Sequence, residues 1–231
     1  MIHRYFIYLL LLLLLQTEYS PFHKQGFFCQ DQKLSRTFTK DTVHPKVLIW
    51  GTVVGSVVLA TFIEYLHNKA KLNFSSVWSR VTDFNTGAVF VLVMTEILKI
   101  TVGEPRPHFL TDCRPFENQN CTPGAYVNSF VCSNNEWSQR SLRDLSKSFP
   151  SGHSSLSVFT AIYFIHYIRQ VMSSKHTVIK FSLITFLICW HLTCALSRIY
   201  DNKHHWWDVL AGIGLGTALG FYKVTSDNRI M

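Results

Sequence analysis

The stretch Lys147–Ile168, KSFPSGHSSLSVFTAIYFIHYI, places a polar turn directly before a long apolar run. Pro150 and Ser151 are typical of a helix start, where proline is tolerated and a serine hydroxyl can cap free backbone N–H groups. These N–H groups also lie at the positive end of the helix dipole, which favours an anion. The turn therefore has two interpretations, an ordinary helix cap and an anion-binding site.

The apolar residues of the 231-residue chain are gathered into six mostly apolar runs. Hydrophobic residues make up 48% of the chain, which is rich for a soluble domain with 18 Phe and 6 Trp. The runs cover residues 5–15, 47–63, 85–95, 154–168, 181–197 and 209–222. Several are shorter than the ~20 residues that cross a bilayer core, but each extends into Ser, Thr, Tyr, Trp or a single charge. We interpret them as six transmembrane helices of an all-α, polytopic membrane protein with a single domain over residues 1–231.

The two alternatives to six transmembrane helices are a soluble protein and a signal peptide in place of the first helix. A soluble protein would need amphipathic helices around buried ones, and the sequence shows neither that periodicity nor a strand-like alternation. The first run follows Arg4 and also fits a signal peptide, but residues 16–18 lack the small side chains of a cleavage site. We therefore favour an uncleaved first span.

The formal net charge of +8 indicates an anionic partner. The chain has no run of five Lys or Arg and no basic helix face, which are the features expected of a nucleic-acid-binding segment. Because the chain is rich in apolar runs, we expect its partners to be the bilayer and anionic lipids, and we expect no nucleic acid.

Six spans would place three loops, residues 17–46, 103–150 and 198–208, on one side of the membrane. Lys and Arg do not settle the orientation, because these loops carry 12 of them and the opposite side carries nine. Four of the six cysteines lie in the three loops: Cys29, Cys113, Cys121 and Cys132. This distribution is typical of an oxidising compartment with one or two disulfides of undetermined pairing, with free thiols as the alternative.

A candidate glycosylation acceptor, Asn120-Cys121-Thr122, falls in the same set of loops. The short loop that carries His67, Lys69, Lys71 and Arg80 would then face the cytoplasm. We expect the three loops to be extracytoplasmic, with the chain in the plasma membrane and these loops outside, or lumenal in an endomembrane.

Strongly polar residues mark the end of the third run, in the stretch KITVGEPRPHF from Lys99 to Phe109. A lysine at the bilayer centre costs about 2.5–3.5 kcal/mol on insertion scales, so Lys99 needs an anion, a route to water or a partner. Glu96, one turn earlier, is the alternative partner. Arg106 lies between two prolines that fix its backbone just outside the span.

A second polar cluster joins the last two runs, in the stretch SRIYDNKHHWWDV from Ser197 to Val209. Arg198 ends the fifth run, and His204 and Asp208 are expected four residues apart on one face of the sixth helix. Such an Asp can hold one imidazole nitrogen as a donor and leave the other free as a base or nucleophile. His205 would point about 100° away, so we give it no catalytic role.

Two further features of the sixth span concern its packing. Trp206 and Trp207 are more typical of membrane-interface anchors than of substrate platforms. Gly212, Gly216 and Gly220 recur every four residues and make a small face for close helix contact. We favour contact inside the bundle over a dimer interface, because a six-helix bundle already supplies neighbours.

The clustered polar residues could hold either a metal or a phosphate. His153, His204 and Asp208 could form a site with two histidines and one carboxylate. However, the same clusters supply two arginines and a lysine, which would repel a divalent cation and bind a phosphate dianion through charge-assisted hydrogen bonds. We therefore favour phosphate, and expect no metal.

Taken together, these residues resemble a known family pattern. The pattern comprises Lys99 and Arg106-Pro107, then Pro150-Ser151-Gly152-His153, then Ser197-Arg198, His204 and Asp208. This resembles the three-part signature of the type-2 phosphatidic acid phosphatase superfamily, complete and in order over about residues 99–208. Within that superfamily, GFFCQD, IEYLHNK, RPHFLTDC and DNKHHWWDVLAG resemble the animal lipid phosphate phosphatases, called Wunen-like in insects.

The resemblance implies an enzyme that hydrolyses the phosphate monoester of phosphatidate, lysophosphatidate, sphingosine 1-phosphate or a related lipid, with no metal or other cofactor. It implies that His204 is a nucleophile that forms a phosphohistidine, that Asp208 orients it, and that His153 is the general acid. The implied phosphate-binding residues are Lys99, Arg106, Ser151, Gly152 and Arg198. A sugar-phosphate phosphatase of the same superfamily and a non-catalytic membrane scaffold or transporter are the alternatives. The preferred lipid and the oligomeric state stay open.

Overall fold

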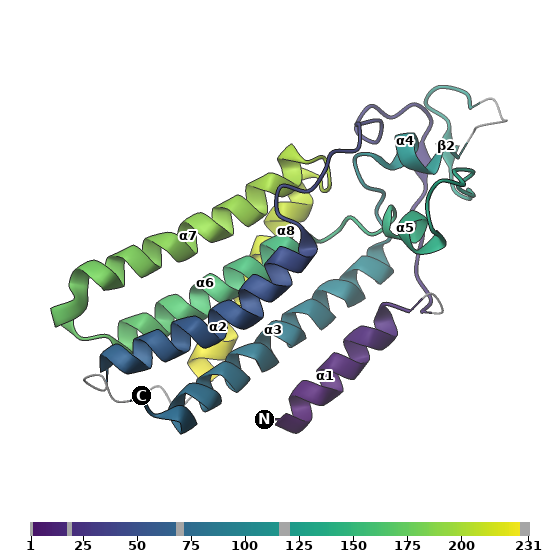
Figure 1. The fold of residues 1–231 in the computed structure, drawn as a ribbon. Helices are drawn as coiled ribbons and strands as arrows, with labels where there is room; N and C mark the ends of the chain where they lie inside the picture. The colour runs from purple at the N-terminus through teal and green to yellow at the C-terminus, as the bar shows by residue number, and fades with distance from the viewer. Residues whose placement is uncertain (1, 18–19, 68–71, 116–120, 227–231) are drawn as a thin grey trace.

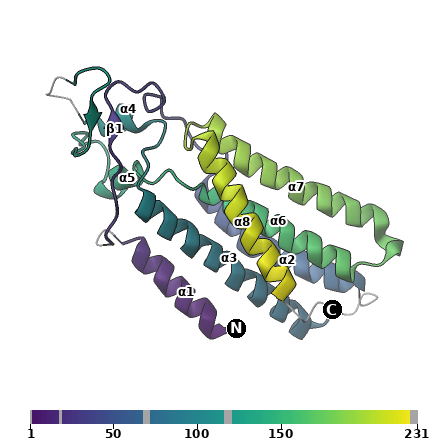
Figure 2. The same ribbon diagram turned by 180° about the vertical axis from the view of Figure 1, so that it is seen from behind.

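Six long helices run side by side and form the framework of the chain (Figures 1 and 2). The structure is a computed structural model that describes residues 2–17, 20–67, 72–115 and 121–226. The long helices are α1 (Ile2–Leu15), α2 (Pro45–His67), α3 (Phe74–Val102), α6 (Gly152–Val171), α7 (Thr177–Tyr200) and α8 (Trp206–Ser226). Each of the six predicted runs lies inside one of them, so the prediction of an all-α bundle is confirmed.

Four of these helices are long and apolar enough to cross a membrane: α2, α3, α7, extended by the short 3₁₀ turn η1 (Ser174–His176), and α8. Helix α1 is apolar but shorter. Helix α6 is not among the four, since its first two turns carry the serine-rich sequence GHSSLS. The length and apolar composition of these helices therefore indicate a multi-pass membrane protein.

Helix α6 lies at the centre of the bundle, where it contacts α2, α3, α7 and α8. It is buried along most of its length, including Ser154, Ser155 and Ser157 near its start. The surrounding helices instead expose large apolar side chains such as Trp50, 66% exposed, and Phe181, 64% exposed. An apolar outer surface around a more polar central helix is the arrangement expected in lipid, where polar groups need protein partners.

The glycines of α8 allow it to approach α6 closely. A Cβ atom added to Gly212 or Gly216 would collide with the carbonyl oxygens of Ser151 and Ser155, and one on Gly220 would lie 3.2 Å from Ile162. Small residues at one helix face permit this backbone contact. The prediction that the glycine face packs inside the bundle is confirmed.

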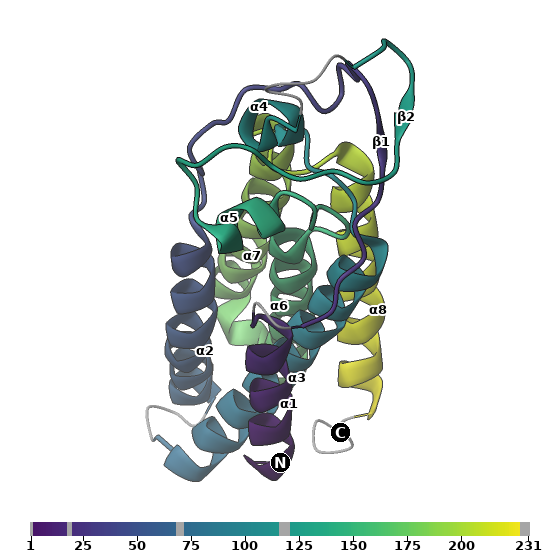
Figure 3. The same ribbon diagram turned by 90° about the vertical axis from the view of Figure 1, so that its right-hand side faces the viewer.

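The three loops that the sequence placed on one side all lie at one end of the bundle (Figure 3). They carry a two-stranded antiparallel ribbon, β1 (Phe27–Phe28) with β2 (Tyr126–Val127), and the short helices α4 (Phe109–Cys113) and α5 (Gln139–Asp144). Two disulfides tie this loop layer together, Cys29–Cys121 and Cys113–Cys132. The prediction of disulfides is thus confirmed, and the structure supplies the pairing. Asn120, Lys69 and Lys71 lie outside the described residues.

Candidate active site

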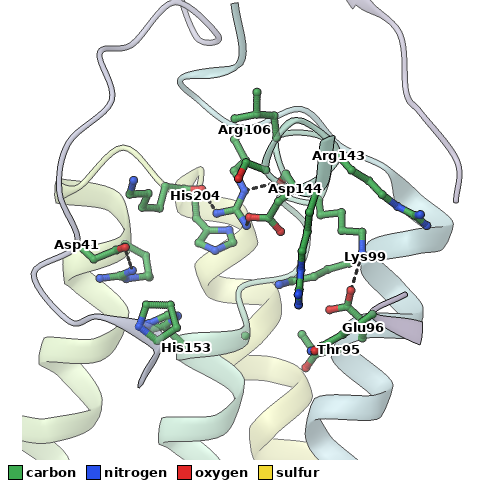
Figure 4. Close-up of a pocket in the computed structure, with 18 of the residues that line it drawn as sticks. Asp41, Thr95, Glu96, Lys99, Arg106, Arg143, Asp144, His153 and His204 are labelled. Carbon is green, nitrogen blue, oxygen red and sulfur yellow. Dashed lines mark hydrogen bonds and ion pairs between the residues drawn. The ribbon is translucent and has the colours of Figure 1, made fainter. Parts of the chain in front are cut away.

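A cavity of about 540 Å³ lies at the end of the bundle that carries the loop layer (Figure 4). Six of the eight predicted site residues line it: Lys99, Arg106, Gly152, His153, Arg198 and His204. They come from the end of α3, the loop after it, the start of α6, the end of α7 and the turn before α8. Part of the lining is apolar, and we call it the leucine wall: Leu12, Leu48, Leu92 and Leu156 from α1, α2, α3 and α6. The cavity therefore has both a cationic and an apolar lining.

The start of α6 supplies both a structural cap and part of the cavity wall. Ser151 is the N-cap, and its hydroxyl accepts hydrogen bonds from Ser154 N at 3.4 Å and Ser154 Oγ at 3.0 Å. Its own N–H donates to the carbonyl oxygen of Asp208 at 3.0 Å, so it is not free for a ligand. Ser151 thus fixes α6 against α8, and its role in phosphate binding stays a prediction.

The next two residues of α6 reach the cavity itself. Gly152 and His153 are in the first helical turn, where backbone N–H groups have no partner within the helix. A Cβ added to Gly152 would lie 3.8 Å from Nζ of Lys99, so the glycine leaves room for the ammonium group beside the helix start. The interpretation of this turn as a helix cap is confirmed at Ser151, and its interpretation as an anion site stays a prediction for the residues that follow.

His204 and Asp208 form a buried pair at the back of the cavity. Helix α8 begins at Trp206, so His204 lies in the preceding turn and not on the helix face that the sequence suggested. Its Nδ1 nevertheless lies 3.5 Å from Oδ2 of Asp208, a long contact of the kind that often shortens when substrate binds. Burial lowers the pKa of His204 to about 4, so its imidazole is neutral at neutral pH. With Nδ1 directed at Asp208, Nε2 is the ring nitrogen left for the cavity.

The neighbouring aromatic residues face away from this pair. Nε2 of His205 lies 3.2 Å from the carbonyl oxygen of Pro105, and its ring stacks on Trp207 at 4.4 Å. Trp206 is 59% exposed, as expected for an interface anchor. Trp207 differs from that expectation, because its Nε1 donates a 2.8 Å hydrogen bond to Oε1 of Glu104.

The two arginines predicted for the site, Arg106 and Arg198, are each held by a carboxylate (Figure 4). Arg106 donates from Nη2 to Oδ2 of Asp144 at 2.8 Å and from Nε to the Asp144 carbonyl at 2.9 Å. Arg198 donates from Nη1 to Oδ1 of Asp41 at 2.7 Å and from Nη2 to Oδ2 of Asp201 at 2.9 Å. These contacts fix the two planar guanidinium groups at the cavity wall.

The sequence missed the partner of Glu96. Lys147, from the loop before α6, places its Nζ 2.7 Å from Oε1 of Glu96, with both side chains nearly buried. The sequence had raised an ion pair between Lys99 and Glu96 on the same helix as an alternative. In the structure, Glu96 pairs with Lys147 instead. Lys147 also lines the cavity, so its positive charge adds to those of Lys99, Arg106 and Arg198.

The sequence also missed Asp41, Asp144 and Lys203, which line the same cavity. Burial lowers the pKa of Lys203 to about 8, and its Nζ lies 3.4 Å from the centre of the Phe38 ring. Of these three residues, only Lys203 could have been found from the sequence, because it directly precedes His204 in the predicted polar cluster. Asp41 lies in the loop before α2 and Asp144 at the end of α5, and only the fold shows that they contact the two arginines.

The metal alternative has no ligand set in the part of the chain that the structure describes. There, no group of three or more His, Cys, Asp or Glu side chains could hold a metal ion. Nε2 of His153 lies 3.0 Å from the carbonyl oxygen of Val43, while Nδ1 of His204 faces Asp208.

Comparison with known proteins identifies the family of this cationic, histidine-containing site. Residues 80–230, which include all three polar clusters, match the family model described as the PAP2 superfamily. The chain belongs to the PAP2 superfamily. The resemblance drawn from the PAP2 signature residues is thus confirmed.

Several animal proteins are similar to this PAP2 chain. It is 32% identical to the "Putative phosphatidate phosphatase" of Drosophila melanogaster, over 89% of this chain and 62% of the relative. It is 29% identical to phospholipid phosphatase 1 of Rattus norvegicus, over 94% of this chain and 83% of the relative. Phospholipid phosphatase 1 of Mus musculus is also 29% identical, over 89% of this chain and 75% of the relative. No solved structure matches the chain significantly.

Proposed function

We propose that this PAP2 protein is a lipid phosphate phosphatase that hydrolyses the phosphate monoester of phosphatidate, lysophosphatidate, sphingosine 1-phosphate or a related lipid. The observation that carries the proposal is the cavity, in which seven positively charged side chains and three histidines lie with leucines from α1, α2, α3 and α6. A phosphate head group suits the cationic part of the lining and an acyl chain suits the leucines. The printed names of the relatives agree with this substrate class.

Substrate binding would use the cations and the start of α6. Lys99, Arg106 and Arg198 would contact the phosphate oxygens, together with the first-turn N–H groups at Gly152 and His153. Asp41 and Asp144 hold the arginines in place while the site is empty. The negative charge that develops on the equatorial oxygens during transfer would be stabilised by the same donors.

The first chemical step would be nucleophilic attack by His204. Its Nε2 would bond to phosphorus while the bond from phosphorus to the ester oxygen breaks, which gives a phosphohistidine. Asp208, 3.5 Å from Nδ1, would stabilise the positive charge that this bond places on the ring. Burial and the charge of Arg198 lower the pKa of His153 in the empty site, but a bound phosphate dianion would favour its protonated form. Protonated His153 would then give the proton on Nδ1 to the departing lipid alkoxide.

The second step would return the enzyme to its starting state. His153, now neutral, would take a proton from a water molecule as the water attacks phosphorus. The bond between phosphorus and Nε2 would break, which releases inorganic phosphate and neutral His204. No metal ion is needed in either step, because the cations supply the positive charge.

The first test of this function uses purified protein in detergent. We expect phosphatidate hydrolysis to continue in excess EDTA and to be inhibited by vanadate, which would occupy the phosphate site. We expect glucose 6-phosphate, which has no apolar chain for the leucine wall, to be hydrolysed far more slowly. Loss of activity on chelation with recovery on adding zinc or magnesium would contradict the metal-free mechanism. A preference for glucose 6-phosphate would favour the sugar-phosphate alternative.

We further propose that all six long helices span the membrane and that the cavity faces the extracytoplasmic side, outside the cell if the protein is in the plasma membrane. The disulfides Cys29–Cys121 and Cys113–Cys132 support this orientation, because disulfides persist in oxidising compartments. Asn73 caps α3 at the opposite end of the bundle, where its side chain accepts from Ser75 N and Ser76 N.

This orientation predicts different fates for two glycosylation acceptors. In animal cells, a glycosidase-sensitive mass shift should disappear with Asn120→Gln and survive Asn73→Gln. Intact cells should dephosphorylate lysophosphatidate added to the medium. A glycan on Asn73, or activity only after the plasma membrane is permeabilised, would reverse the proposed topology.

A further inference from the structure

The carboxylate of Asp208 is held asymmetrically. Its Oδ2 accepts from Ser148 Oγ at 2.5 Å and from His205 N at 2.9 Å, and it also faces Nδ1 of His204. Its Oδ1 is buried, and no donor among the described residues reaches it. A buried carboxylate oxygen without a donor is costly, so the second oxygen needs a hydrogen bond that the other side chains do not supply.

Glu104 is the group placed to supply it. Glu104 lies in the loop after α3, and its carboxyl group is within hydrogen-bonding reach of the carboxyl group of Asp208. Oε1 of Glu104 already accepts from Nε1 of Trp207 at 2.8 Å. Ser148 ties the two acids together, because its N–H donates to the Glu104 carbonyl at 2.9 Å while its hydroxyl donates to Asp208. Two carboxylates this close repel each other unless they share a proton.

We propose that Glu104 is a positioning residue that holds a proton on its second carboxyl oxygen and donates it in a hydrogen bond to Oδ1 of Asp208. The proton stays on Glu104, so Asp208 remains a carboxylate toward His204. This inference rests on the proposed function, since it acts through the pair that would form and stabilise the phosphohistidine. It extends that pair to a chain of three groups, Glu104, Asp208 and His204.

The charge environment of Glu104 makes this arrangement sensitive to pH. Burial and the negative charge of Asp208 together raise the pKa of Glu104 to about 7, although the hydrogen bond from the Trp207 N–H opposes them. Other ionisable groups nearby are His205, stacked on Trp207, and Lys33, whose Nζ lies 5.9 Å from the Trp207 ring centre. Burial lowers the pKa of His205, which favours its neutral form.

The direction of the pH effect follows from the protonation state of Glu104, because only its protonated carboxyl group can donate a hydrogen bond to Asp208. Below pH 7, Glu104 is mostly protonated and Asp208 keeps its donor. As pH rises through 7, Glu104 ionises, the hydrogen bond is lost and the two carboxylates repel each other. We therefore expect kcat/KM to fall on the alkaline side as the alignment of Asp208 with His204 deteriorates.

The test compares pH profiles of phosphatidate hydrolysis in three full-length variants. Glu104→Gln keeps a neutral donor at every pH, so its kcat/KM should match the parent near pH 6 and exceed it by about tenfold near pH 9. Trp207→Phe removes the N–H that stabilises ionised Glu104, so its alkaline fall should move to higher pH. Glu136→Gln is the matched control, because its side chain is 74% exposed and faces Arg114, so its profile should follow the parent.

A spectroscopic measurement decides the question without relying on activity. The infrared difference spectrum between pH 6 and pH 8 should contain the loss of a protonated-carboxyl band, which is absent in Glu104→Gln and present in Glu136→Gln. A Glu104→Gln profile parallel to the parent, or a parent spectrum without that band, would overturn the inference. Failure of the proposed function would look different, since the parent would then not hydrolyse phosphatidate while the band could still be seen.

Discussion

His204→Ala should abolish lipid phosphate hydrolysis and phosphoenzyme formation together. Nε2 of His204 is the neutral ring nitrogen directed to the cavity, and its partner Asp208 lies behind it at 3.5 Å. An alanine has no atom that can attack phosphorus, so we expect kcat to fall by roughly 10⁵- to 10⁶-fold. Release of phosphate from radiolabelled phosphatidate and acid-labile label on the protein measure the two effects in one sample.

A neighbouring histidine provides the control. The ring of His205 contacts Pro105 and Trp207, and only its backbone N–H reaches Asp208. His205→Ala keeps that N–H and should therefore still form phosphoenzyme. Acid-labile label on His204→Ala at the parent level would remove His204 from the role of nucleophile.

The helices could be predicted from the sequence because lipid-facing helices need apolar side chains along most of their surface. All six runs became helices, and the loop layer formed at the predicted end. Helix α6 shows where hydropathy alone reaches its limit. Its first turns are polar because they face α8 and the cavity, so hydropathy alone does not mark α6 as a membrane span. In the sequence, the helix is indicated mainly by the apolar residues after Ser157.

The catalytic candidates could also be predicted, because their spacing follows from chemistry that needs cations and a histidine with a carboxylate. Their partners could not, since Asp41 and Asp144 meet Arg198 and Arg106 only through long-range packing. The sequence also did not reveal the partner of the Ser151 N–H. The close contact of α6 with α8 gives that N–H to the Asp208 carbonyl.

His153→Ala should slow turnover by roughly 10²- to 10⁴-fold while still allowing phosphoenzyme to form. The ring of His153 is oriented by the contact of Nε2 with the Val43 carbonyl at 3.0 Å, which leaves Nδ1 for the cavity. In the proposed mechanism it protonates the lipid alkoxide, and His204 remains able to attack without it. The loss of activity in His153→Ala should therefore be larger for a substrate whose departing oxygen is more basic.

That dependence separates a general acid from a residue that only binds substrate. With a lipid analogue whose phosphate is esterified to a nitrophenol, the leaving group departs as a stable anion, so His153→Ala should lose far less activity than it does with phosphatidate. His44→Ala is the matched control, because His44 adjoins Val43 but is exposed and does not line the cavity. It should leave both substrates unaffected. An equal loss with the two leaving groups would show that His153 acts in binding or folding, because a proton donor matters only where the departing oxygen is basic.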